Sequence, residues 1–155
     1  MTSIRAAQEG DVDTLVAIGE EMLAGSSFAP LHYSPLRVAA FVRRCIAEGF
    51  AAVSLQGDEI TGVVLGDIVQ PWYSEDRMGV EHVLYVRPQH QGSRAALMLV
   101  RAWMVWCFEC GAKQLRPGTS AGSAAADRLY AAMGFERTGA LYVMNRKDSD
   151  VRQQR

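Results

Sequence analysis

The feature that most limits how this chain can fold is a strand-like run that passes through a glycine turn into a long apolar helix. Residues 80–86 are mostly apolar, with β-branched and aromatic members, which predicts a strand. Gly92 then precedes residues 94–110, a helical stretch whose charged groups gather on one edge and leave the rest of its circumference apolar. Because such a helix must be covered on most sides, we expect it to pack on a sheet.

Hydrophobic periodicity predicts further elements on both sides of this unit. They are a strand at 2–6, helices at 11–24 and 35–48 with Asp11 and Ser34 as N-caps, a hairpin of 50–55 and 60–69, a strand at 114–117, a helix at 124–133 and a last pair of strands at 135–137 and 141–145. Nothing separates these elements into two domains. We therefore expect one α/β domain over residues 1–147 and a polar tail over residues 148–155.

Composition excludes several classes of protein. The chain has 155 residues, enough for one domain with a sizeable core, and its formal net charge of −1 favours neither nucleic acid nor a membrane surface as a partner. We expect no signal peptide, and the longest apolar stretch is too short to span a bilayer. Its three cysteines form no disulfide framework, so we expect a cytoplasmic protein.

The junction between the strand and the long helix has the features of an anion site. The first N–H groups of a helix have no intrahelical partner, and they favour phosphate together with the helix dipole. Gly92 lets the backbone approach a ligand closely. An ordinary strand-to-helix connection would read similarly, and the P-loop and Rossmann glycine patterns are absent. The junction alone leaves both interpretations open.

This junction resembles the acyl-CoA-binding motif of the GNAT family of N-acetyltransferases, Gln/Arg-x-x-Gly-x-Gly/Ala after Val-x-Pro. The chain has Val86 and Pro88, followed by Gln91-Gly92-Ser93-Arg94-Ala95-Ala96. Arg94 stands where the family normally has glycine. Its guanidinium can pair with pyrophosphate oxygens, and the alternative is a solvated first-turn arginine.

A second stretch is similar to the family's Ala-x-x-Leu-Tyr-x-x-x-Gly-Phe signature, and it carries Ala126, Leu129, Tyr130, Gly134 and Phe135 in that order. The family often has asparagine where this chain has Ser123. The resemblance covers residues 2–146. It implies an α/β (α+β) fold with a mixed central sheet of about six or seven strands, about four flanking helices and a possible homodimer.

The resemblance also implies where acetyl-CoA, the co-substrate, would bind. The contacting residues would be Leu84, Tyr85, Val86, Gln91, Gly92, Ser93, Arg94, Ala95, Ala96, Ser123 and Tyr130. The backbone of residues 84–86 would bond the pantetheine arm, and one of its N–H groups can polarise the thioester carbonyl.

Two side chains are candidate catalysts. The Tyr130 hydroxyl would lie near the CoA sulfur and serve as general acid, the alternative being a packed core tyrosine. Glu81 is the better candidate for the base, because related enzymes often place a glutamate early on this strand; His82 and water remain alternatives. Strict alternation along the strand predicts Glu81 on the face of Val83 and Tyr85, with His82 on the opposite face.

The acceptor side would be built from the loop between the first two helices and the loop before residue 80. The substrate-binding candidates are Tyr33, Trp72, Tyr73 and Glu75, with His32 and Asp76 nearby. Aromatic and acidic groups suit a cationic amine, although ordinary polar loops can look the same. No cluster of metal ligands is evident, so we expect no metal.

These observations lead to one hypothesis and one rival. The first is an acyl-CoA-dependent N-acetyltransferase that moves an acetyl group from acetyl-CoA to a primary amine of a small molecule, peptide or protein by direct attack. The rival is a catalytically silent CoA-binding sensor or interaction module, favoured by Arg94 and Ser123. The sequence does not choose the acceptor.

Overall fold

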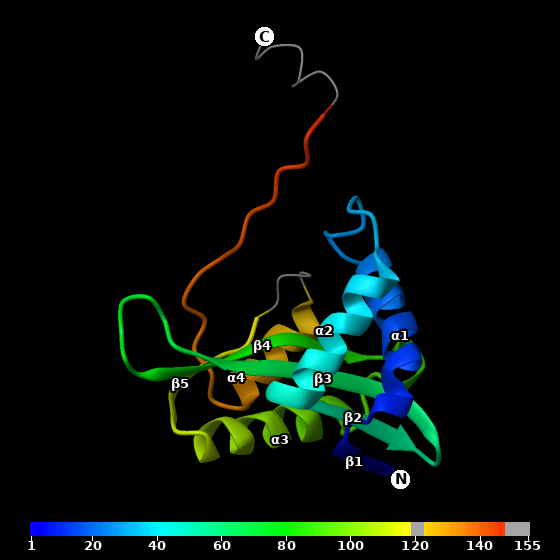
Figure 1. Cartoon of the computed structure of the whole chain (residues 1–155), viewed down its shortest axis with the longest axis horizontal. Coiled ribbons are helices and arrows are strands. Elements are labelled where there is room, and N and C mark those ends of the chain that lie inside the picture. The colour runs from blue at the N-terminus through cyan, green and yellow to red at the C-terminus, as the bar shows by residue number, and fades with distance from the viewer. Residues whose placement is uncertain (119–122, 148–155) are drawn as a thin grey trace.

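Five strands form a single sheet in the order β1-β2-β3-β4-β5 in the computed structural model, which describes residues 1–118 and 123–147 (Figure 1). The predicted polar tail, residues 148–155, lies outside the described residues. The elements in chain order are β1 (Thr2–Ala6), η1 (Glu9–Asp11), α1 (Val12–Ala24), α2 (Pro35–Glu48), β2 (Phe50–Gln56), β3 (Glu59–Val69), β4 (Arg77–Val86), η2 (Pro88–His90), α3 (Ala95–Glu109), β5 (Ala112–Arg116) and α4 (Ala124–Ala132).

The sheet is covered on both faces. Helices α1 and α2 lie on one face, where a cluster built around Leu15, Ile18 and Val42 packs, and helices α3 and α4 lie on the other, around Leu99 and Trp103 (Figure 1). Strand β3 supplies side chains to both clusters, so its residues from Ile60 to Leu65 are buried without interruption. This is the reason that β3 reads in the sequence as a continuous apolar run.

The pairing of β4 differs on its two sides. Strand β3 runs antiparallel to it along nearly its whole length, whereas β5 pairs with it in parallel only from Arg77 to Val80. Residues 81–86 of β4 therefore have no strand partner on the β5 side in the described part of the chain. The two strands diverge beyond this point, at the β5 edge of the sheet.

The prediction of six or seven strands is wrong for the described residues, which form five. The expected last pair, at 135–137 and 141–145, is not formed, and these residues run without regular structure. A strand is stable only when a neighbour completes its hydrogen bonds, and no described strand pairs with this segment.

Most predicted helix boundaries are confirmed to within two residues. Ser34 and Ser123 accept hydrogen bonds from the backbone of Arg37 and Ala126, as N-caps do. Asp11 is the N-cap residue of α1, as predicted, but its side chain makes no capping bond to the helix. Its carboxylate accepts hydrogen bonds from Arg5 and from the backbone N–H of Gln8 instead. Among the described residues, no helix is both long enough and apolar enough to cross a membrane.

Candidate active site

A β-bulge in β4 sets the directions of the side chains at the point where β4 and β5 diverge. Leu65 pairs with Val83 and Gly66 with Glu81, so His82 is an extra residue on β4. The bulge interrupts the alternation, and the prediction from strict alternation is therefore wrong here. Glu81 faces α4, whereas His82 and Val83 both lie on the side of α1 and α2.

Glu81 and Tyr130 are in direct contact near the point where β4 and β5 diverge. The hydroxyl of Tyr130, on α4, donates a hydrogen bond of 2.5 Å to Oε2 of Glu81. The Tyr130 ring packs edge-on against Phe135, which also anchors the end of α4 through its backbone bond to the Tyr130 carbonyl. The pair joins residues 49 positions apart in the sequence.

Burial changes the acid–base properties of both groups. It raises the pKa of Glu81 to about 7, because the charged carboxylate loses its water, and the Tyr130 hydrogen bond offsets this only in part. The pKa of Tyr130 is raised as well, first by burial and then by the neighbouring Glu81 carboxylate. Near neutral pH, Glu81 can therefore gain or lose a proton, while Tyr130 holds its proton and can donate it.

A cavity of about 630 Å³ lies against this pair. One part of its lining comes from α1, α2 and the loop between them, and another part comes from Ser123, Ala126 and Tyr130 of the α4 region. Residues 81–84 of β4, which lack a β5 partner, also line it. The cavity thus touches both helical layers at the opening between the strands.

His82 belongs to a charged cluster at the edge of the cavity. Its Nε2 lies 2.6 Å from Oδ2 of Asp67, and Arg44 forms a double ion pair with the same carboxylate at 2.8 and 3.0 Å. These contacts keep the pKa of Asp67 below its ordinary value despite its burial. Asp67 and Arg44 were missed from the sequence, although an acidic residue near the end of the apolar β3 run was a usable signal.

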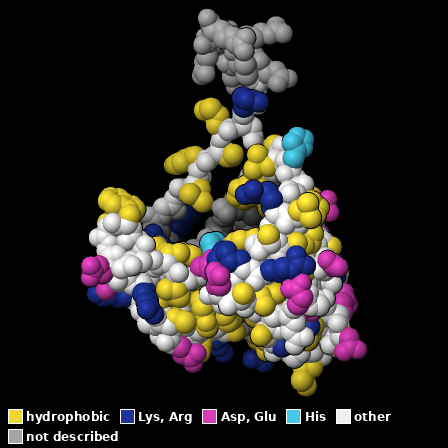
Figure 2. Space-filling model, in the orientation of Figure 1, with side chains coloured by type: hydrophobic (Ala, Val, Ile, Leu, Met, Phe, Trp, Pro, Cys, Tyr) yellow, Lys and Arg dark blue, Asp and Glu magenta, His cyan; other side chains and the backbone are white. Residues whose placement is uncertain are grey.

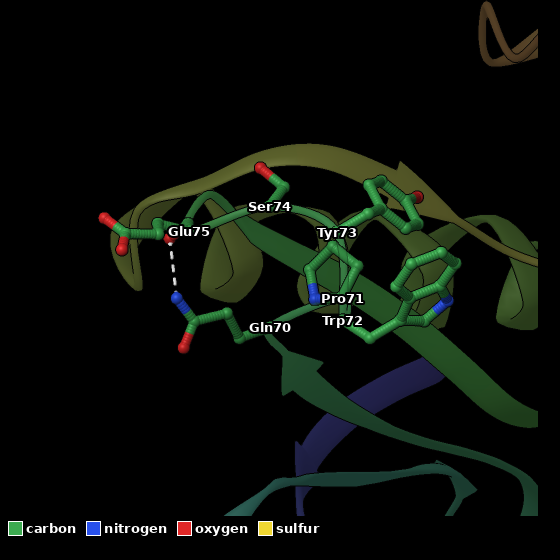
Figure 3. A pocket seen from close by; sticks show the side chains of 6 residues that line it. All are labelled: Gln70, Pro71, Trp72, Tyr73, Ser74 and Glu75. Atoms are coloured by element: carbon green, nitrogen blue, oxygen red, sulfur yellow. Dashed lines mark hydrogen bonds between the residues drawn. The ribbon is translucent and has the colours of Figure 1, made fainter.

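The predicted acceptor residues lie in two places. Tyr33 lines the cavity, and its hydroxyl donates a hydrogen bond of 2.6 Å to the carbonyl oxygen of Val16. Trp72, Tyr73 and Glu75 lie together in the loop between β3 and β4, where they line a separate, open pocket with Gln70, Pro71 and Ser74 (Figure 3). The rings of Trp72 and Tyr73 meet edge to face, and both side chains are exposed. His32 is with Tyr33 at the cavity, and Asp76 pairs with Lys113.

The predicted phosphate-binding turn is held at both ends. Gly92 has a φ of +82°, a conformation that glycine adopts without strain, and the Gln91 side chain bonds to the Val86 carbonyl at the end of β4. Ser93 Oγ accepts the N–H of Ala95, the first residue of α3. Within the described residues, no acceptor is found for the backbone N–H groups of Gly92, Arg94 and Ala96.

The remaining predicted residues lie on β4 and at the start of α3. Leu84 lines the cavity, and the Tyr85 hydroxyl donates a hydrogen bond to Glu21 of α1. Val86 and Ala95, the first residue of α3, are both buried in the core between α3 and the sheet. Arg94 is exposed, with no ionic partner among the described residues. No group of three or more His, Cys, Asp or Glu side chains in the described ranges is placed to hold a metal ion.

Solved structures share this fold. A predicted acetyltransferase with acetyl-CoA from Clostridium acetobutylicum matches with a TM-score of 0.77 at 17% identity, covering 94% of this chain and 96% of that one. The aminoglycoside N-acetyltransferase AAC(6')-Iy in complex with CoA matches with a TM-score of 0.74 at 14% identity, covering 96% of this chain and 95% of that one. A transcriptional regulator from Bacillus halodurans matches with a TM-score of 0.75 at 20% identity, covering 94% of this chain and 99% of that one.

Sequence comparison gives a consistent result. No curated protein matches the chain by sequence. The model of the acetyltransferase (GNAT) family matches residues 22–135, which include β4, the turn at Gly92 and Tyr130. With the match spanning most of the chain and the fold shared with solved acetyltransferases, the protein belongs to the acetyltransferase (GNAT) family.

Proposed function

We propose that this protein is an N-acetyltransferase that transfers the acetyl group of acetyl-CoA to a primary amine by direct attack. The observation that carries the proposal is the Glu81–Tyr130 pair at the point where β4 and β5 diverge, facing the cavity. A base and an acid are both needed for this chemistry, and the pair supplies both within one hydrogen bond.

The residues present fit acetyl-CoA as the co-substrate. The backbone N–H groups of Gly92, Arg94 and Ala96, which have no acceptor among the described residues, lie at the N-terminus of α3, where the helix dipole favours a pyrophosphate. The Arg94 guanidinium can add a charge-assisted bond there. At residues 84–86, the side of β4 that pairs with no described strand can bond the pantetheine arm, much as an added strand would.

The side chains then divide the proton transfers. As the amine nitrogen bonds to the acetyl carbon and the C–S bond breaks, Glu81 accepts the proton that the nitrogen loses. Tyr130 donates its proton to the departing CoA sulfur. The hydrogen bond between the two side chains allows Glu81 to return its proton to the Tyr130 oxygen, so the pair ends the reaction as it began. His82, held by Asp67, remains the alternative base.

We propose that the acceptor enters from the side of α1 and α2. Tyr33 and His32 lie there in the cavity wall, and the wall is largely apolar around them. This part of the cavity can accept the amine of a small molecule, a peptide or a protein. Trp72, Tyr73 and Glu75 remain predicted contacts for a longer acceptor. We place the reaction in the cytoplasm, because Cys45, Cys107 and Cys110 are free thiols.

The function is tested in two stages with the full-length protein. Calorimetry should detect acetyl-CoA binding, and a screen of small amines and peptides should then detect release of free CoA thiol that depends on both substrates. Failure to bind acetyl-CoA would overturn the proposal. Tight binding without transfer to any acceptor in a broad screen would instead support the silent CoA-binding module.

Arg94→Ala should weaken acetyl-CoA binding by about 1–3 kcal/mol, because a charge-assisted bond to the pyrophosphate is lost. The loss should shrink in high salt, since Arg94 is exposed. Calorimetry at two salt concentrations measures both effects. Arg101→Ala, which removes an exposed arginine within α3, is the matched control and should leave binding unchanged. Equal affinities for both variants would mean that Arg94 is a solvated arginine.

A further inference from the structure

The wall of the cavity on the side of α1 and α2 is apolar. Large hydrophobic side chains line it from both helices, from the loop between them and from β3; among them are Met22, Leu23, Phe28, Leu31, Phe41 and Leu65. Two of these, Phe28 and Leu31 in the loop, are 38% and 69% exposed. Figure 2 shows hydrophobic side chains at the surface of this loop. Exposed hydrophobic groups at the rim of a cavity indicate that its ligand is apolar.

Most polar groups in this wall already have partners. The Tyr33 hydroxyl bonds to a carbonyl oxygen of α1, and the Ser34 hydroxyl caps α2. His82 bonds to a carboxylate of β3, and Glu81 accepts its hydrogen bond from α4. An acceptor rich in hydroxyl groups would bury polar atoms here without enough partners, and each such atom costs free energy. The wall therefore suits an acceptor with few polar groups besides its amine.

The charges in the wall suit a single ammonium group. Among the described residues that line the cavity, the carboxylates are Glu20 and Glu81. Burial raises the pKa of Glu81 to about 7, so this group carries only part of a negative charge near neutral pH. Glu20 is exposed, and the same wall contains Arg37, also exposed, which has no ionic partner among the described residues. A polycation would meet too few negative charges to offset the loss of its water.

We propose that the acceptor is a primary monoamine with an apolar body, which lies between α1 and α2 while its nitrogen meets Glu81. The inference rests on the proposed function, since it names the substrate of the same site. The cavity of about 630 Å³ is large enough for a small molecule of this kind. An apolar wall also lowers the pKa of the bound amine by removing its water, which favours the neutral form that attacks the thioester.

A series of alkylamines tests the apolar body directly. Ethylamine, butylamine and hexylamine have nearly the same basicity and differ only in the length of the alkyl chain. The wild-type kcat/KM, followed by release of CoA thiol from acetyl-CoA, should rise about 2–4-fold with each added methylene, because each one is transferred from water to the apolar wall. 1,6-Diaminohexane matches hexylamine in length but carries a second ammonium group. Per amine, it should react at least about tenfold less efficiently than hexylamine.

Two phenylalanine variants test where the alkyl chain binds. Phe28→Ala shortens a side chain in the cavity wall, so the ratio of kcat/KM for hexylamine to that for ethylamine should fall about tenfold. Phe108→Ala removes an exposed ring from α3, outside the cavity, and should leave this ratio unchanged. An unchanged ratio in Phe28→Ala, or an equal fall in both variants, would overturn the placement of the apolar body.

The outcomes separate this inference from the proposed function. If any amine releases CoA thiol, the order of the amines alone decides the inference. Equal kcat/KM along the alkyl series, or 1,6-diaminohexane equal to or better than hexylamine, would then overturn it. If no amine reacts, the proposed function fails, and binding decides the inference instead. Calorimetry on the complex with CoA should then show hexylamine binding more tightly than ethylamine and 1,6-diaminohexane, and equal or undetectable binding of the three would overturn the inference as well.

Discussion

The Tyr130→Phe variant should bind acetyl-CoA nearly as well as the wild type but turn over about 10²–10⁴-fold more slowly. The substitution removes one hydroxyl and keeps the ring, so the contact with Phe135 and the packing of α4 are retained. If the hydroxyl protonates the departing sulfur, its loss affects mainly the transition state, so kcat falls while KM for acetyl-CoA changes little. Single-turnover measurements with an identified acceptor isolate the chemical step.

Tyr142→Phe is the matched control, because it removes a hydroxyl that is exposed and remote from the cavity. It should leave kcat unchanged. Tyr130→Phe should also move the pKa of Glu81 further above its ordinary value, because the Tyr130 hydrogen bond holds that pKa down. A Tyr130→Phe enzyme with wild-type turnover and chemistry rate-limiting would remove Tyr130 from the mechanism.

The second large effect concerns Glu81. The wild-type kcat/KM should rise with pH through about 7, because Glu81 accepts a proton only in its carboxylate form and burial places its pKa there. Glu81→Gln keeps the shape and still accepts the Tyr130 hydrogen bond, but it cannot accept a proton. Activity at neutral pH should fall about 100-fold or more, and the rise through pH 7 should disappear. A pH–rate profile of both proteins measures this.

His82→Gln tests the alternative base at the neighbouring position. We expect it to keep the rise through pH 7, since the imidazole lies on the other face of β4 with Asp67 and Arg44. The opposite pattern, with the pH dependence lost in His82→Gln and kept in Glu81→Gln, would assign the base to His82. Acetyl-CoA affinity, measured by calorimetry on both variants, confirms that each remains folded.

Local signals in the sequence were sufficient for most of the elements. The apolar stripe and the serine cap predict α2 from its own residues, without reference to the rest of the chain. The continuous apolar run predicts β3 as a strand that is buried on both faces. The two family signatures predicted the turn at Gly92 and the position of Tyr130 on α4. Strand β4 begins three residues earlier than predicted because Arg77 pairs with Ala112, a contact 35 residues away.

The contact between Glu81 and Tyr130 could not be derived from spacing. A strand pattern with a period of two predicts the face of each side chain only while the pairing is regular, and the single extra residue at His82 reverses it. Nothing local marks the bulge, because it is set by the register between β3 and β4. The Asp67–His82 contact depends on the same register.

The sequence by itself determined the helices, the strands that pack on both faces, the glycine turn before α3 and the family, because each depends on residues close together or on a fixed motif. The tertiary structure alone decided where β4 separates from β5, that Glu81 faces Tyr130 in a part-buried site, and that the last predicted strand pairs with no strand in the described part of the chain. These features arise from pairing between distant segments, and pairing and burial fix both the direction of the side chains and the raised pKa of Glu81.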